Sequence, residues 1–323
     1  MITVVIPTIG RPTLRDTLAA VGPGVPVIVV DDRALATEQE GGTRTAPPLL
    51  AEPPPHVRVV RSGGRGPAAA RNAGWRAADT PWVVFLDDDV IPAQGWAEAV
   101  WKDLVDLPDD VAGSQGRIVV PLPADRRPTD GERHTAGLTG ALWVTADMAY
   151  RRSALEAVGG FDERFPRAYR EDADLALRVT RAGHRLVRGE RVTEHPVRAD
   201  GFWASVRFQR GNADDALMRR LHGPSWRADI GGGRGRLRLH ALTTAAGLAA
   251  LLLGTAAATG ARTKVTALGA GAAWAALTAE FAWRRIAPGP RTPLEVLRMA
   301  VTSVLIPPVA CAHRLRGEWR VRR

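Results

Sequence analysis

Trp82-Val83-Val84-Phe85-Leu86-Asp87-Asp88-Asp89 joins five apolar residues to three consecutive carboxylates. A continuous apolar run of this length is typical of a strand that is buried on both faces of a parallel sheet. Ligands of open α/β sheets bind at the carboxyl ends of such strands. Adjacent carboxylates repel one another unless a cation or hydrogen-bond donors lie between them. The segment therefore predicts a buried strand with a site at its end, where a hard cation such as Mg²⁺ or Mn²⁺ would find oxygen ligands.

Strands and helices alternate along the first 100 or so residues. Three apolar runs precede the run at 82–86. They lie at residues 2–6, 26–30 and 57–60, and the second is followed by Asp31-Asp32. Helices are expected at 13–20 and 68–78. This alternation predicts an α/β, Rossmann-like and mostly parallel sheet. Further along we expect helices at 95–107, 152–158 and 171–182, extended segments at 116–121, 142–146 and 148–150, and loops at 38–55 and 123–139.

Composition excludes several classes of protein. The chain has 323 residues, 45% of them hydrophobic and 24% charged, so it is not intrinsically disordered. Its single cysteine allows neither a disulfide framework nor a thiolate zinc site. The net charge of +10 combines +13 in residues 219–323, which hold 17 basic and 4 acidic residues, with −3 in residues 1–218. A mildly acidic domain does not favour nucleic acid as a partner.

The basic region contains three long apolar segments. Residues 241–261 carry no charge, 265–283 carry one, and 294–313 carry two with a Pro307-Pro308 pair. We expect an N-terminal domain at 1–218, a basic Gly/Arg-rich linker at 219–240 and a C-terminal membrane-associated helical region at 241–323. A soluble helical subdomain is the alternative.

The order of charges around these segments predicts their topology. The first residues lack the features of a secretory signal, so the N-terminal domain is expected in the cytoplasm. The first two apolar segments would form a hairpin joined by a turn at 262–264. The third would lie in the interface, because Pro307-Pro308 interrupts a span and a crossing would place a tail with five arginines outside.

Two further motifs have competing interpretations. Residues 64–69 (Gly-Arg-Gly-Pro-Ala-Ala) mimic a dinucleotide-binding fingerprint, with Asp87 about 20 residues on. That fingerprint belongs after the first strand, so a loop before a helix is the favoured interpretation.

Residues 171–174 place three carboxylates at a helix start, more than capping needs, which indicates a candidate general base. His195 is equally compatible with a structural role and with a metal ligand. Trp143 is favoured as a core residue over an acceptor contact.

Six motifs in order give the chain a resemblance to family 2 glycosyltransferases, which have the GT-A fold. The similarity covers about residues 1–215. The motifs are Val4-Val5-Ile6-Pro7-Thr8, Val29-Val30-Asp31-Asp32, Ala69-Ala70-Arg71-Asn72-Ala73-Gly74, Phe85-Leu86-Asp87-Asp88-Asp89, Gly159-Gly160-Phe161-Asp162-Glu163 and Arg170-Glu171-Asp172-Ala173-Asp174-Leu175.

The resemblance implies a role for each candidate residue. Asp172 matches the catalytic base, with Glu171 as the less favoured candidate. Asp87 and Asp89 match the two ends of the D-x-D element that holds ribose and metal, and His195 matches a histidine that completes the metal shell in some members. The residues implied to line the nucleotide pocket are Pro7, Thr8, Asp31, Arg71, Asn72, Asp87 and Asp88.

The implied activity is a metal-dependent, inverting glycosyl transfer. The donor would be a nucleoside-diphosphate sugar, a UDP-sugar first, and the acceptor a hydroxyl of a cell-envelope, lipid-linked or glycan molecule. Mn²⁺ or Mg²⁺ would be the cofactor, and the catalytic domain would lie on the cytoplasmic side of the cell membrane. A nucleotide-sugar binding protein without activity is the alternative, and a dinucleotide-dependent oxidoreductase is less favoured.

Overall fold

The computed structural model describes residues 1–34, 47–198, 201–256 and 261–322. Residues 38–46 of the loop expected at 38–55 therefore lie outside the described residues, and residues 47–55 contain no helix or strand. The chain divides into two compact units. The first comprises Met1–Pro121, Ala136–Pro196 and Asp229–Gly231, and the second comprises Leu122–Thr135, Val197–Ala228 and Gly232–Arg323.

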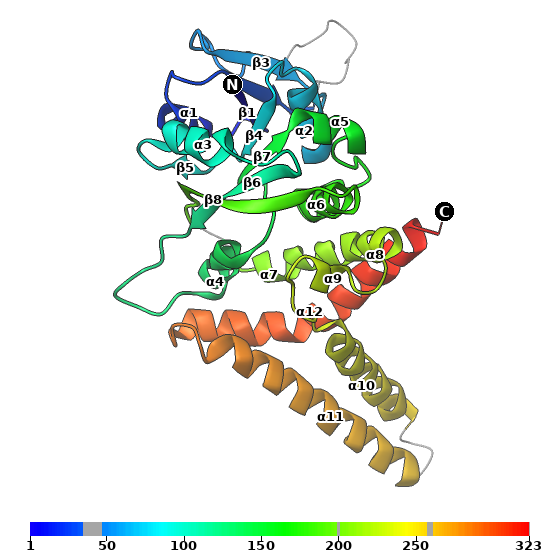
Figure 1. Cartoon of the computed structure of the whole chain (residues 1–323). Helices are drawn as coiled ribbons and strands as arrows, with labels where there is room; N and C mark the ends of the chain where they lie inside the picture. Colours follow the sequence, from blue (N-terminus) through cyan, green and yellow to red (C-terminus); the bar gives the residue numbers. More distant parts are fainter. Residues whose placement is uncertain (35–46, 199–200, 257–260, 323) are drawn as a thin grey trace, which may run out of the picture. The chain divides into compact units, whose positions relative to one another are not determined.

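One sheet forms the centre of the first unit, in the blue to green part of Figure 1. Its strand order is β3-β2-β1-β4-β7-β6-β8-β5. The first four strands in this order are parallel, β7 is antiparallel to both of its neighbours, and β8 is parallel to β6. The strands are β1 (Ile2–Thr8), β2 (Val27–Asp31), β3 (Val57–Arg61), β4 (Trp82–Leu86), β5 (Ile91–Pro92), β6 (Val111–Val119), β7 (Asp147–Arg151) and β8 (Arg185–Glu194). The expected mostly parallel α/β sheet is confirmed.

Both faces of this sheet are covered, as the uninterrupted apolar runs predict. Along β1, Val4 and Ile6 face one hydrophobic cluster with α1 and α3, and Val5 faces the other with α2, α5 and α6. A Cβ on Gly74 of α2 would lie 2.3 Å from the Val5 side chain, so glycine allows this helix to approach the sheet closely. The helices are α1 (Leu14–Val21), α2 (Pro67–Arg76), α3 (Trp96–Val105), α5 (Arg152–Val158) and α6 (Glu171–Arg181).

Two expectations for residues 123–146 are wrong. The expected loop contains α4 (Asp130–Ala136) and η1 (Gly137–Gly140). Thr129 and Glu132 form a reciprocal capping box at the start of α4, a signal that was present in the sequence. Residues 142–146 form no strand, because the Gln115 side chain binds the backbone there and holds the segment out of the ladder. Trp143 packs against the cluster beneath α2, as expected.

The second unit is helical. Its helices, besides α4, are α7 (Ala204–Arg207), η2 (Phe208–Arg210), α8 (Gly211–His222), α9 (Trp226–Asp229), α10 (Leu237–Thr255), α11 (Ala261–Ile286) and α12 (Pro293–Arg320). Because α12 packs against α8, residues 197–228 group with the apolar helices, which differs from the domain boundary expected at 218. A Cβ on Gly317 would lie 2.6 Å from Ala213, so this glycine allows the close contact.

Within the described residues, three helices are long and apolar enough to cross a membrane, by length and composition: α10, residues 262–286 of α11, and α12. Two local expectations are wrong here. Residues 262–264 lie in the first turn of α11 rather than in a connecting turn, and α12 continues through Pro307-Pro308. Ile306 and Ala310 on either side of the proline pair are buried, so packing holds the helix together where two prolines weaken it.

Candidate active site

The carboxyl ends of three neighbouring parallel strands meet at one edge of the sheet. Thr8 at the end of β1 pairs in register with Asp31 at the end of β2, and Asp87 follows the end of β4 directly. The sequence predicted this juxtaposition, because consecutive parallel strands place their carboxyl ends together.

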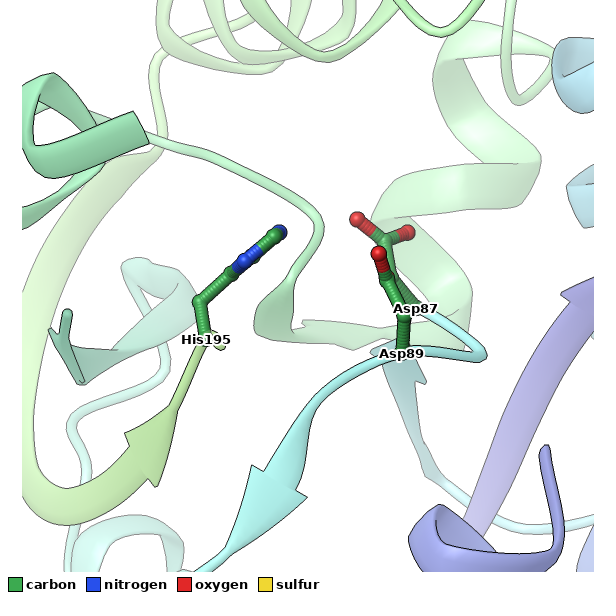
Figure 2. A group of neighbouring side chains, drawn as sticks. All are labelled: Asp87, Asp89 and His195. Carbon is green, nitrogen blue, oxygen red and sulfur yellow. The ribbon is translucent and has the colours of Figure 1, made fainter. Parts of the chain in front are cut away.

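A candidate metal centre lies at this edge. Asp87, Asp89 and His195 each offer one ligand atom, and the three atoms lie within 4.8 Å of one another. Figure 2 shows the two aspartates on the turn after β4, with the imidazole facing them from the end of β8. Asp89 is 5% exposed. Two carboxylates and an imidazole form a donor set that fits Mn²⁺, and the carboxylates also suit Mg²⁺.

The pairing of two distant strands brings His195 to the aspartates. Strand β5 comes just after the three aspartates, and it pairs antiparallel with β8, so that Ile91 lies opposite Glu194. The backbone N–H of His195 donates to the backbone carbonyl of Val119 at 2.8 Å. With the ring proton on Nδ1, the imidazole donates to the Pro196 carbonyl at 3.2 Å, and Nε2 keeps its lone pair for a cation.

Asp88, the middle aspartate, is buried and bound by protein side chains, so it does not line a nucleotide pocket as expected. Its two oxygens accept hydrogen bonds from the Thr8 hydroxyl and the Arg11 guanidinium, each at 2.6 Å. Asp88 is 2% exposed, and these bonds tie the loop after β1 to the turn after β4. Thr8 in turn accepts from the Gly10 N–H. Sequence reasoning assigned no role to Arg11.

The last residue of β2, Asp31, and the next residue, Asp32, are also bound by protein groups. Arg33 donates to both oxygens of Asp31, and this hydrogen bonding holds the pKa of the Asp31 carboxyl below its usual range. Asp32 accepts from the Ser62 hydroxyl at 2.7 Å and from the Gly66 N–H at 2.9 Å. Gly66 immediately precedes α2, so a carboxylate occupies the amide that a dinucleotide pyrophosphate would need there. This contact argues against the oxidoreductase alternative.

Arg71 and Asn72 on α2 are both buried, with exposed fractions of 2% and 1%. Arg71 donates to Glu171 at 2.7 Å and to Asp87 at 2.8 Å. Asn72 binds both backbone polar groups of Phe161 and donates to Glu163 at 3.0 Å. Phe161 and Glu163, the two partners of Asn72, lie in the sequence motif at 159–163, but the sequence analysis assigned them no role.

The candidate base lies at the start of α6. Glu171 is 2% exposed and Asp172 is partly exposed. Burial raises the pKa of both carboxyls, and repulsion from neighbouring carboxylates raises it further. The positive charge of Arg71 lowers both pKa values but offsets these effects only in part. Arg170, the preceding residue, has a φ of 78°, a conformation unfavourable for a non-glycine residue and typical of functional sites. A partly exposed carboxyl with a raised pKa is suited to accept a proton.

Comparison with known families identifies the type of domain. Residues 3–159 match the family described as Glycosyl transferase family 2. This segment of the chain is similar to a family 2 glycosyltransferase domain. The match includes β1 to β7 and the three aspartates, but it ends before α6 and His195.

Two curated relatives and one solved structure are similar to this chain. Two curated relatives, each described as a pre-mycofactocin glycosyltransferase and both from Mycobacterium tuberculosis strains, are 34% identical over 197 residues. The match includes 57% of this chain and 40% of each relative, so the chain spans less than half of their length. A mannosyltransferase from Pyrobaculum calidifontis, solved with GDP-Man and Mn²⁺, matches with a TM-score of 0.51 and 18% identity, covering 99% of this chain and 87% of the other. That likeness shows the fold of the glycosyltransferase domain.

The buried Glu171 carboxyl should make stability depend on pH. Its pKa is raised from 4.5 to about 8, so the folded protein holds a proton that the unfolded chain releases, and stability falls as pH rises through that window. In Glu171→Gln this loss disappears. We expect the thermal midpoint of the full chain in detergent to fall less for the variant than for the wild type between about pH 5 and about pH 8.5. Equal decreases would contradict the assignment.

Proposed function

We propose that the protein transfers a sugar from a nucleoside-diphosphate sugar to an acceptor hydroxyl with inversion at the anomeric carbon. The observation that carries this proposal is the convergence of Asp87, Asp89 and His195, whose ligand atoms lie within 4.8 Å at the carboxyl edge of the sheet. A UDP-sugar is the first donor to test. The family 2 match supports the reaction class, and the acceptor is proposed to be a glycan or a lipid-linked or other cell-envelope molecule.

The side chains of this edge have distinct tasks in the proposed reaction. Asp87, Asp89 and His195 would hold Mn²⁺ or Mg²⁺. The cation, when bound, neutralises the diphosphate leaving group. Asp31 and the end of β1 at Pro7 and Thr8 would receive the nucleoside, with Asp88 fixing that strand end through Thr8. The strand end then needs no reorganisation when the donor binds.

Asp172 is proposed as the general base. Its carboxyl takes the proton from the acceptor hydroxyl as the oxygen attacks the anomeric carbon on the face opposite the diphosphate. Burial raises the pKa of Asp172, which makes the carboxylate a better proton acceptor than an exposed aspartate. Glu171 is the weaker candidate because its side chain is buried against Arg71.

Two isosteric variants separate the base from the metal ligand. Asp172→Asn should lower kcat by at least about 100-fold, the usual contribution of a general base, and leave binding of the donor sugar in Mn²⁺ unchanged. Asp89→Asn should remove Mn²⁺-dependent donor binding as well as transfer. Isothermal titration and a radiolabelled transfer assay on the full chain measure both quantities. If Asp172→Asn loses donor binding and keeps turnover, Asp172 is misassigned; full activity in EDTA would exclude the metal.

The apolar helices of the second unit support membrane association. Leu251 on α10 and Leu268 on α11 are 70% and 73% exposed. The 19 residues of α10 span about 28 Å at 1.5 Å per residue, close to the thickness of a bilayer core. At the charged ends of these helices, Glu280 pairs with Arg236 and Arg284. Such an arrangement suits a hairpin whose charged end lies at the membrane interface.

We further propose that α12 stays in the interface and does not cross. Its apolar window is 39% buried within the protein, compared with 6% for α10 and for α11. A crossing would also place five arginines of the tail outside. The glycosyltransferase domain and both ends of the chain would then lie in the cytoplasm.

Reporter fusions test this topology. Green fluorescent protein at the C-terminus should fluoresce, and alkaline phosphatase at the same position should be inactive, because the hairpin returns the chain to the cytoplasm. Alkaline phosphatase fused directly after α10 should be active, since the chain has then crossed once. An active phosphatase at the C-terminus would contradict the hairpin, and a freely soluble full-length protein would contradict membrane association.

A further inference from the structure

Arg71 joins two parts of the candidate active site that are distant in sequence. From α2, one terminal nitrogen of its guanidinium donates to Asp87 at 2.8 Å, and the other donates to Glu171 at 2.7 Å. Asp87 belongs to the turn that offers metal ligands, and Glu171 begins the helix that carries Asp172. A single side chain therefore links the donor side of the site to the acceptor side.

Charge balance at this point depends on Arg71. Among the groups that affect it most, Asp87, Glu171 and Asp172 are acidic side chains, and the guanidinium is the cation between them. An arginine side chain keeps its charge under all conditions of interest, and its planar fork directs two donors at fixed positions. A lysine at this position would keep the charge but would present it from one point, so it could not hold both carboxylates in the same geometry.

The surroundings of Arg71 fix its orientation and keep it away from substrate. Its guanidinium carbon lies 5.7 Å from the centroid of the Phe161 ring, a cation–π arrangement. The neighbouring Asn72 holds Phe161 by two backbone hydrogen bonds, of 2.8 and 2.9 Å, and Trp75 donates to Asn72 at 2.9 Å. With 2% of its surface exposed, Arg71 acts through the carboxylates that it binds.

Asp87 is the contact through which this link would affect a metal. Its side chain is 29% exposed, so one part of the carboxylate is bound by Arg71 while another part faces the open side of the site. A hydrogen-bond donor behind a ligating carboxylate sets its orientation, and loss of such a donor typically weakens metal binding by about 10- to 100-fold.

We propose that Arg71 is a positioning residue that orients Asp87 for the metal and anchors the start of α6, so that metal affinity and the placement of the base depend on one guanidinium. The proposal rests on the proposed function, because it requires a cation at Asp87, Asp89 and His195. It replaces the expectation that Arg71 touches the nucleotide.

The test measures Mn²⁺ affinity of the full chain in detergent, by electron paramagnetic resonance of the free ion. Arg71→Met keeps the unbranched apolar part of the side chain and removes both hydrogen bonds, so we expect the Kd for Mn²⁺ to rise by about 10-fold or more. Arg71→Lys should give an intermediate Kd. Arg178→Met is the matched control, because Arg178 forms an ion pair with Asp174 on α6 away from the metal ligands and should leave the Kd unchanged.

The outcomes separate this proposal from the proposed function. If the wild type does not bind Mn²⁺, or if Asp89→Asn binds it equally well, the proposed metal site itself is wrong. If the wild type binds Mn²⁺ and both folded Arg71 variants bind it as tightly or more tightly, Arg71 has no positioning role. If Arg71→Met does not fold, judged by its thermal midpoint, Arg71→Lys decides. A fall in kcat with a normal Kd for Mn²⁺ in both variants would also overturn the link to Asp87.

Discussion

Negative charge is concentrated at one edge of a parallel sheet, and this concentration constrains the rest of the first unit. Carboxylates repel one another unless donors or cations compensate them. The protein provides a separate partner for most of them: Arg33 for Asp31, the N–H of Gly66 for Asp32, and Thr8 with Arg11 for Asp88. Asp87 accepts a hydrogen bond from Arg71, and in addition Asp87 and Asp89 each offer a ligand atom to the space that His195 also faces. The packing that provides these partners thus leaves a place for one cation.

The sequence predicted the sheet and the carboxylates well, because both depend on local patterns. Uninterrupted apolar runs such as 82–86 can be accommodated only between two covered faces, and helices α1 and α2 cover those faces. The capping box of α4 was a local signal that the prediction missed, whereas elsewhere the prediction failed because a partner distant in sequence decides the structure. Gln115 holds residues 142–146 out of the sheet, and no local pattern indicates that contact.

The candidate site shows the same division between local and distant information. The motifs located Asp172 and Arg71, but they could not indicate that Arg71 is buried between two carboxylates, one of them 100 residues away. The position of His195 depends on the pairing of the two-residue strand β5 with β8, which is too short for a sequence pattern to predict. In the second unit, the apolar content of α12 was visible from the sequence, whereas its packing on α8 was not.

The central claim is that Asp87, Asp89 and His195 hold one cation. The most direct measurement is pulsed electron paramagnetic resonance of Mn²⁺ bound to the full chain, with histidine labelled by ¹⁵N, because a nitrogen ligand couples to the electron spin of the metal. We expect a histidine-nitrogen coupling in the wild type that disappears in His195→Ala. Bound Mn²⁺ without nitrogen coupling, or a coupling that persists in His195→Ala, would contradict the account.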